Sequence, residues 1–157
     1  MWEIYLLKLL QNHLPSEYNV YSPNANYGTN LLTGNMREIR PDILIEKNGR
    51  VLMIIDAKYK NYYCFGKTSE YGVSRNDLYQ MSTYLYHYGK HDESIIGIFT
   101  APVEGIKNDI HTYSENRKHR IGLVNLNIAV ADDDTYRIHL IEEEYINTIL
   151  SLLNEQC

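Results

Sequence analysis

Apolar residues near the start of the chain recur at helical spacing. Residues 1–14 place them on one broad stripe, and Pro15 follows as a helix-ending residue. The same spacing returns in residues 74–88, where Ser74 precedes the stripe as an N-cap and Gly89 follows it as a stop. We therefore predict two helices with these bounds, each burying one face.

Strand patterns lie between the two predicted helices. Apolar runs at 41–46 and 51–59 flank Asn48-Gly49, a strong signal for a β-hairpin. The turn-rich segment before them contains one short strand at 18–21.

The last third of the chain predicts more strands and a closing helix. A buried strand covers 94–103, and residues 119–130 form either a strand pair or one long bent strand. Residues 135–141 alternate as an edge strand, and 142–156 form a helix whose first turn is acidic, as the helix dipole favours. The order α-β-β-β-α-β-β-β-α predicts an α/β fold, in which one central mixed sheet carries helices on its faces.

Length, charge and cysteine content narrow the class of protein. A chain of 157 residues is long enough for one sizeable core, so we expect a single domain over 1–157. The net charge of −5 counts against strong DNA binding by this chain alone. No run reaches membrane-spanning length, and the two cysteines, Cys64 and Cys157, lie far apart. We expect a soluble cytoplasmic protein with free thiols.

Three charged residues at the ends of the predicted hairpin form the candidate site. Asp56 and Lys58 are two positions apart, so they share one face of their strand. A two-residue turn that pairs Lys47 with Arg50 places Asp42 on the opposite face. A three-residue loop, or an equivalent bulge, places Asp42 opposite Asp56. The site therefore requires the longer loop or a bulge.

Two carboxylates that meet at short range repel each other unless a cation lies between them. Hard oxygen ligands favour Mg²⁺ or Mn²⁺, and the backbone carbonyl of Ala57 is positioned to face the same ligand. Such a metal polarises a phosphoryl oxygen and activates water, and Lys58 offsets the developing charge, which together predict a phosphodiester hydrolase. The less favoured alternative is a plain hairpin in which Asp42 caps a turn and Asp56 pairs with Lys58 or Arg40.

The arrangement of these motifs resembles the PD-(D/E)XK nuclease superfamily. The residues that carry the resemblance are Pro41-Asp42, Asp56-Ala57-Lys58, Gln80-x-x-x-Tyr84 and, on the first helix, Glu3. The motifs "WE.Y...LL", "RPDI", "IIDAKYK" and "NDLYQM..Y", in this order, are most similar to the McrC-type nuclease subunits of modified-cytosine restriction systems. The resemblance implies a restriction-endonuclease-like α/β/α core with a central mixed sheet flanked by helices.

The resemblance also implies a role for each matching residue. Asp42 and Asp56 are expected to bind Mg²⁺ or Mn²⁺ with the Ala57 carbonyl, Glu3 contributes to the metal or to its water shell, and Lys58 is the catalytic lysine. Gln80 is expected to orient a phosphate or the nucleophile, with Tyr84 supporting it from the next helical turn. One alternative stays open for the last two residues, namely a hydrogen-bonded pair on an amphipathic helix.

The function implied is that of a metal-dependent DNA endonuclease, the cleavage component of a McrBC-like restriction system. Its expected partners are DNA, a separate McrB-like AAA+ GTPase that recognises the target, and a second copy of the chain for double-strand cleavage. McrC-type proteins usually carry a further N-terminal region for that GTPase, whereas this sequence starts at what resembles the first nuclease helix. Two alternatives are a nuclease of the same fold in DNA repair or mobile-element defence, and a catalytically silent nucleic-acid-binding or assembly module.

Overall fold

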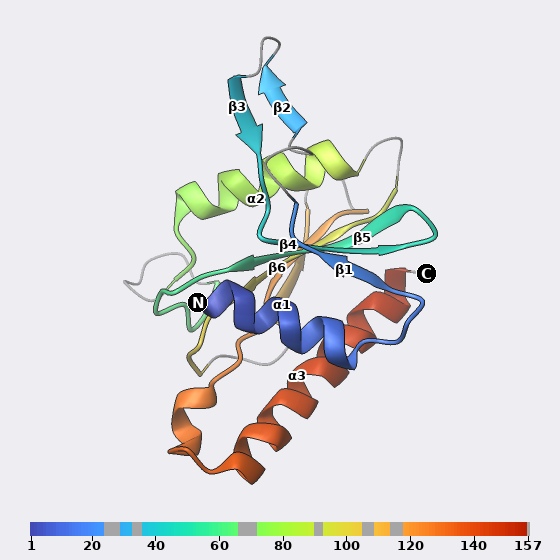
Figure 1. The fold of residues 1–157 in the computed structure, drawn as a ribbon. Coiled ribbons are helices and arrows are strands. Elements are labelled where there is room, and N and C mark those ends of the chain that lie inside the picture. The colour runs from blue at the N-terminus through green and yellow to red at the C-terminus, as the bar shows by residue number, and fades with distance from the viewer. Residues whose placement is uncertain are drawn as a thin grey trace.

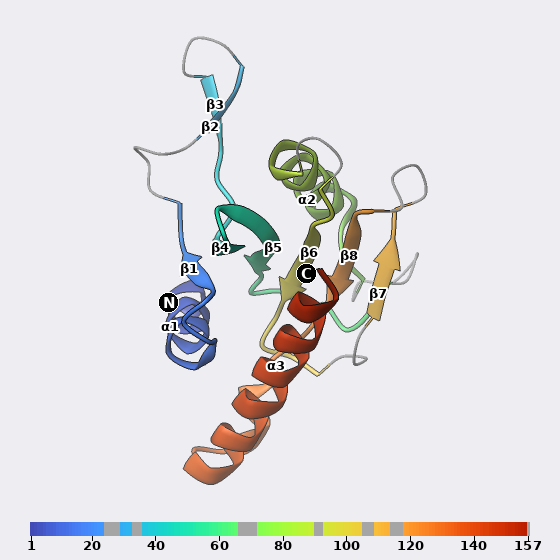
Figure 2. The same cartoon turned by 90° about the vertical axis from the view of Figure 1, so that its right-hand side faces the viewer.

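A mixed six-stranded sheet forms the centre of the molecule. The structure is a computed structural model that describes residues 1–23, 29–32, 36–65, 72–89, 93–104, 109–113 and 118–156. The strands of the sheet are β1 (Asn19–Tyr21), β4 (Ile43–Lys47), β5 (Arg50–Ala57), β6 (Ile96–Thr100), β7 (Asp109–Thr112) and β8 (Arg120–Leu123). Their order across the sheet is β1-β4-β5-β6-β8-β7 (Figure 2). β5, β6 and β8 run parallel to one another, and the other neighbours are antiparallel.

Among the described residues, three α-helices cover the sheet, on both of its faces (Figure 1). They are α1 (Trp2–His13), α2 (Arg75–Tyr88) and α3 (Thr135–Gln156). Buried residues of α1 and α3 pack against one face of the sheet, and buried residues of α2 pack against the other. The predicted α/β class with a restriction-endonuclease-like core is confirmed.

α2 lies close to the sheet because β6 carries a glycine beneath it. A Cβ atom added at Gly97 would lie 2.5 Å from the Met81 sulfur, so a larger residue there would push the helix outward. The predicted helix ends are also observed. The Ser74 hydroxyl accepts a hydrogen bond from the Asp77 amide, and the Gly89 amide donates to the Leu85 carbonyl. These contacts define where α2 begins and ends.

The predicted edge strand at 135–141 is wrong, because these residues form the first two turns of α3. The Asp134 carboxylate accepts hydrogen bonds from the amides of Tyr136 and Arg137, and this contact starts the helix at Thr135. Acidic residues are also absent from the first turn of α3, contrary to the prediction for a helix that starts at 142. An alternating pattern only seven residues long does not distinguish a strand from a helix end whose side chains are mostly exposed.

Other predicted strands differ in extent. Within 119–130 only β8 is a strand; the Val124 and Leu126 amides still bond to the carbonyls of Phe99 and Ala101, and a 3-10 turn at Ile128–Ala131 follows. The sequence analysis did not predict β7, nor a separate hairpin of β2 (Thr29–Leu32) and β3 (Met36–Ile39). That hairpin extends from the molecule on the α2 side of the sheet (Figure 1). In the described parts of the chain, no helix combines the length and apolarity needed to cross a membrane.

Candidate active site

The turn of the β4–β5 hairpin is the short one that the sequence analysis considered. Asn48 and Gly49 both have positive φ, at 54° and 74°, the conformation of a type I′ turn. Lys47 pairs with Arg50 across it. If the pairing continued unchanged, Asp42 would point to the wrong face of the sheet.

A bulge corrects the register before the strands end. Glu46 is opposite Val51, but Ile45 is opposite Met53, so Leu52 has no partner residue on β4. Leu52 and Met53, although adjacent, both belong to the apolar layer beneath α1 and α3. The bulge shifts the remaining pairs by one residue and places the two aspartates on the face that α2 covers. The predicted requirement for a longer loop or a bulge is therefore met by the bulge.

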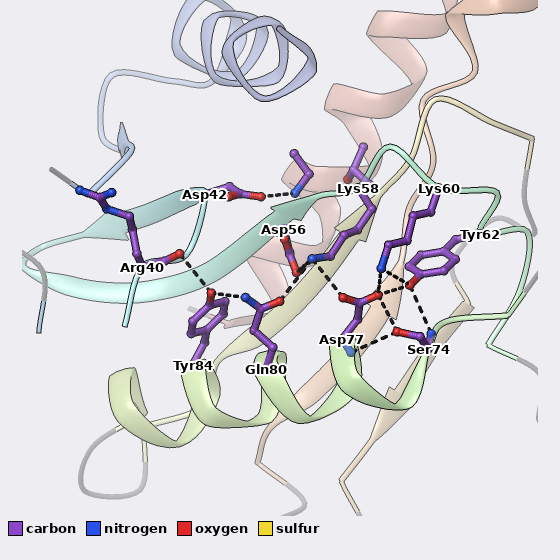
Figure 3. Close-up of polar contacts among 12 residues, drawn as sticks. Arg40, Asp42, Asp56, Lys58, Lys60, Tyr62, Ser74, Asp77, Gln80 and Tyr84 are labelled. Atoms are coloured by element: carbon purple, nitrogen blue, oxygen red, sulfur yellow. Dashed lines mark hydrogen bonds and ion pairs between the residues drawn. The ribbon is translucent and has the colours of Figure 1, made fainter. Parts of the chain in front are cut away.

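Asp42 and Asp56 lie together where β4 and β5 approach α2 (Figure 3). Asp42 Oδ2 accepts a hydrogen bond of 2.8 Å from the Ala57 amide, which fixes its orientation. Asp56 is 3% exposed. Burial and, next, the hydrogen bond and charge of the Asp56 carboxyl raise the pKa of Asp42 to about 7. The fold thus holds two carboxyl groups close enough to interact directly.

Lys58 reaches the carboxylate pair from the end of β5. Its Nζ lies 2.9 Å from Asp56 Oδ2 and 3.2 Å from Asp77 Oδ1, and it donates a 3.3 Å hydrogen bond to Gln80 Oε1. Burial lowers the pKa of Lys58, but the two carboxylates outweigh burial and raise it above the ordinary value. The Lys58 amide donates to the Thr100 carbonyl on β6, so backbone and side chain are both held. The Lys58 ammonium is thus held between Asp56, Asp77 and Gln80.

Gln80 and Tyr84 lie one turn apart on α2 and face the site, as predicted. Gln80 Nε2 donates a 2.8 Å hydrogen bond to the Tyr84 hydroxyl, which itself donates to the Arg40 carbonyl at 3.0 Å. Burial and, next, the charges of the two aspartates raise the pKa of Tyr84 to about 12, so the hydroxyl stays protonated. Gln80 and Tyr84 therefore do form the hydrogen-bonded helix-face pair that was the alternative. The same hydrogen bond turns the Gln80 amide so that its oxygen faces Lys58.

Asp77 is the residue that the sequence analysis missed. Its carboxylate is buried and contacts Lys58, Lys60, the Ser74 hydroxyl and the Tyr62 hydroxyl. Burial would raise the pKa of Asp77, but hydrogen bonds from Lys60, Tyr62 and Ser74, together with the Lys58 charge, hold it well below its usual range. The available signal was the spacing Ser74-x-x-Asp77, a capping-box pattern of which only the serine was used.

Trp2 joins the start of α1 to the same end of the sheet, and Glu3 is the next residue of that helix. Trp2 Nε1 donates a 3.2 Å hydrogen bond to the Thr100 carbonyl, the acceptor that the Lys58 amide also uses. Glu3 is exposed, and its charge makes a small contribution to the raised pKa of Asp42. Its role at a metal or in the water shell stays a prediction.

The residues present fit a hard divalent cation. Asp56 Oδ2 is buried and, among the described residues, has no hydrogen bond of acceptable geometry, although the Lys58 ammonium is nearby. The Lys58 ammonium, 2.9 Å away, is therefore the cation that compensates this buried oxygen, and a divalent cation is a second species that can take its place. No three His, Cys, Asp or Glu side chains in the described part of the chain are grouped to hold a metal. Asp42 and Asp56 would be the protein ligands of such a cation, and two carboxylates would suit Mg²⁺ because this ion keeps several waters and phosphate oxygens as ligands. A role for the Ala57 carbonyl stays a prediction.

Comparison with known proteins identifies the family. The family model described as "McrBC 5-methylcytosine restriction system component" matches residues 1–99, which include the site from Asp42 to Tyr84. The chain belongs to the McrBC family. The resemblance stated from the motifs is thereby confirmed. No curated protein is similar enough to be matched.

A solved structure with the same fold accompanies the family match. It is the half-complex from a tetradecameric assembly of Thermococcus gammatolerans McrB AAA+ hexamers with bound McrC, in which one chain superposes with a TM-score of 0.68 and 17% identity. The match covers 94% of the present chain and 32% of that chain, so the McrBC-family chain described here spans about a third of its length. At this level of identity the likeness concerns the fold.

Proposed function

We propose that this chain is the metal-dependent DNA-cleaving component of a McrBC-type restriction system. The observation that carries the proposal is the meeting of Asp42, Asp56 and Lys58 at one end of the sheet, with a buried carboxylate oxygen that lacks a hydrogen bond. The plain-hairpin alternative accounts for the ion pair between Asp56 and Lys58, but it gives no reason for a second carboxyl group, Asp42, beside that pair.

In this proposal each side chain has a distinct task. Asp42 and Asp56 hold Mg²⁺ or Mn²⁺, with the Ala57 amide keeping Asp42 oriented. The bound metal would polarise the scissile phosphate and lower the pKa of an attacking water. Lys58 places its ammonium beside the phosphate and offsets the charge that develops on it. Gln80 keeps its amide oxygen on Lys58 and thereby limits where the ammonium can move.

The partners follow from family membership and from the charge of the chain. An McrB-like AAA+ GTPase is proposed as the target-recognising partner, since the structural relative is an assembly of McrB hexamers with McrC. The acidic balance of −5 supports this dependence, because an acidic chain gains little from phosphate neutralisation. Double-strand cleavage needs two active sites, so two copies are proposed to act together. Cleavage of both strands by a particle with a single copy would contradict that part.

Plasmid nicking with and without the GTPase, GTP and Mg²⁺ or Mn²⁺ tests the activity. We expect metal-dependent cleavage that falls by about 10²–10³-fold in Lys58→Met, because the phosphate charge is no longer offset. Lys8→Met is the matched control for loss of a lysine, since Lys8 is exposed on α1. Absence of cleavage under every combination of metal and partner would instead identify a silent assembly module.

A further inference from the structure

Lys58 lies between two carboxylates that are satisfied to very different degrees (Figure 3). The distance from its Nζ is 2.9 Å to Asp56 Oδ2 and 3.2 Å to Asp77 Oδ1. The Asp56 oxygen has no hydrogen bond of good geometry in the described part of the chain. The Lys58 ammonium is therefore shared by two oxygens. Asp56 Oδ2 depends on this ion pair, whereas Asp77 Oδ1 belongs to a carboxylate that other residues also hold.

Asp77 is held by contacts that do not involve the metal site. Ser74 Oγ donates a 2.7 Å hydrogen bond to Asp77 Oδ2, and Lys60 Nζ lies 2.6 Å from the same oxygen. The Tyr62 hydroxyl donates to that oxygen as well. Because these partners all engage Oδ2, the other oxygen is left pointing at Lys58. The carboxylate is a fixed anchor with one oxygen assigned to the lysine.

We propose that Asp77 is a positioning residue that competes with Asp56 for Lys58 and thereby keeps Asp56 Oδ2 accessible to a divalent cation. The inference rests on the proposed function, because it assumes that Asp56 is a metal ligand. It concerns Asp77, a residue within the motif "NDLYQM..Y" to which the sequence analysis assigned no role.

The physical argument is a competition between two cations for one oxygen. An ammonium at 2.9 Å from Asp56 Oδ2 occupies space and charge that a metal would need. With Asp77 in place, Lys58 can leave Asp56 without losing an anionic partner, so metal entry does not strand a buried charge. If the charge of Asp77 is removed, Asp56 is the one carboxylate that remains among these Lys58 contacts. The metal then has to displace the Lys58 ammonium from Asp56.

A double-mutant cycle on metal affinity tests this competition. Mn²⁺ binding is measured by isothermal titration calorimetry, without DNA, for the full chain and for Asp77→Asn, Lys58→Met and the double variant. We expect Asp77→Asn to weaken Mn²⁺ binding about tenfold, and Lys58→Met to strengthen it. In the Lys58→Met background, Asp77→Asn should change the affinity by less than about twofold, because no ammonium remains to compete.

Two matched variants separate positioning from folding. Ser82→Ala removes a hydroxyl of α2 that bonds to the Leu78 carbonyl and should leave Mn²⁺ affinity near that of the unmodified chain, whereas a tenfold loss would assign the effect to helix structure and overturn the inference. Lys60→Met removes one of the two ammonium groups that contact Asp77 in the described part of the chain, leaves Lys58 as the other, and should not weaken binding.

The remaining outcomes are equally decisive. Normal Mn²⁺ affinity in Asp77→Asn, or an equal loss with and without Lys58, overturns the inference while the nuclease proposal stands. Failure of the unmodified chain to bind Mn²⁺ overturns both. If Asp77→Asn does not fold, Lys58→Met still decides, since unchanged or weaker binding would exclude competition.

Discussion

Lys58 lies between Asp77 and the Asp42–Asp56 pair, and the surroundings of these aspartates give the same residue type two different roles. Around Asp77, hydroxyl and ammonium donors surround a buried carboxylate and hold its pKa below the usual range. Asp42 is also largely buried, but its charged neighbour is a second carboxylate, Asp56, and the pKa of Asp42 rises to about 7. Burial is common to both, so the difference comes from the donors that surround each group.

The difference has a chemical meaning. A carboxylate that is already paired offers little to a cation, whereas a pair of poorly compensated carboxylates gains from one. The Asp77 cluster therefore has the properties of a support, and the Asp42–Asp56 pair has the properties of a binding site. Four changes test this contrast, and they are ordered from the largest expected effect to the smallest.

Asp56→Asn should have the largest effect on cleavage. The change removes a proposed metal ligand while keeping its shape, so activity should fall by about 10³-fold or more in a plasmid assay with Mg²⁺. Because repulsion within the carboxylate pair is also relieved, the melting temperature in EDTA should not fall. Glu143→Gln, an exposed site on α3, is the control for loss of one negative charge. A fully active Asp56→Asn chain would exclude Asp56 from catalysis.

Asp77→Ala should have the largest effect on stability. It leaves the Lys58 and Lys60 ammonium groups without their shared carboxylate and removes a contact at the start of α2. We expect the free energy of unfolding to fall by about 2–4 kcal/mol, measured by urea denaturation in EDTA. A loss below about 0.5 kcal/mol would show that the cluster is not a structural support.

The stability of the metal-free protein should depend on pH through Asp42. Its pKa is raised from 3.8 in the reference state to about 7 in the fold, so the folded state binds more protons between these values. Stability should therefore be greatest at the acidic side of this window and fall as pH rises towards 7. Asp42→Asn should flatten the profile and add about 1–2 kcal/mol at pH 8. An unchanged slope in that variant would assign the titration to another group.

Lys60→Met should have the smallest effect. The Lys60 side chain is 50% exposed, so its ion pair with Asp77 is partly screened by solvent. The expected loss of stability is below about 1 kcal/mol. Plasmid cleavage at moderate salt should change little, in contrast to Lys58→Met in the same assay. A Lys60→Met defect as large as that of Lys58→Met would place both lysines on the phosphate.

The sequence predicted the parts of the site that depend on local signals. Asn48-Gly49 gives the hairpin turn and Ser74 gives the start of α2, because each acts through backbone conformation within a few residues. Strand spacing gives Asp56 and Lys58 on one face. Helical spacing gives Gln80 next to Tyr84.

Other parts depend on contacts that a single sequence does not reveal. The bulge at Leu52 lies in a continuous apolar run, so no polar residue marks the position where two neighbours share one face. The role of Asp77 depends on Lys60 and Tyr62 folding back from the loop after β5. The start of α3 depends on capping by Asp134, whose neighbours have the composition of an ordinary turn.

The bulge takes up the one residue by which the β5 arm of the hairpin is longer than the β4 arm between the turn and the site. Loss of Leu52 would leave a regular hairpin in which Asp42 still lies opposite Asp56, so the bulge residue itself is dispensable for the register. Loss of one residue from β4, with the bulge kept, would instead place Asp42 opposite Ile55, on the side of α1 and α3 and away from Lys58. The relative lengths of the two arms, counted from the Asn48-Gly49 turn, therefore matter to this site as much as its charged side chains do.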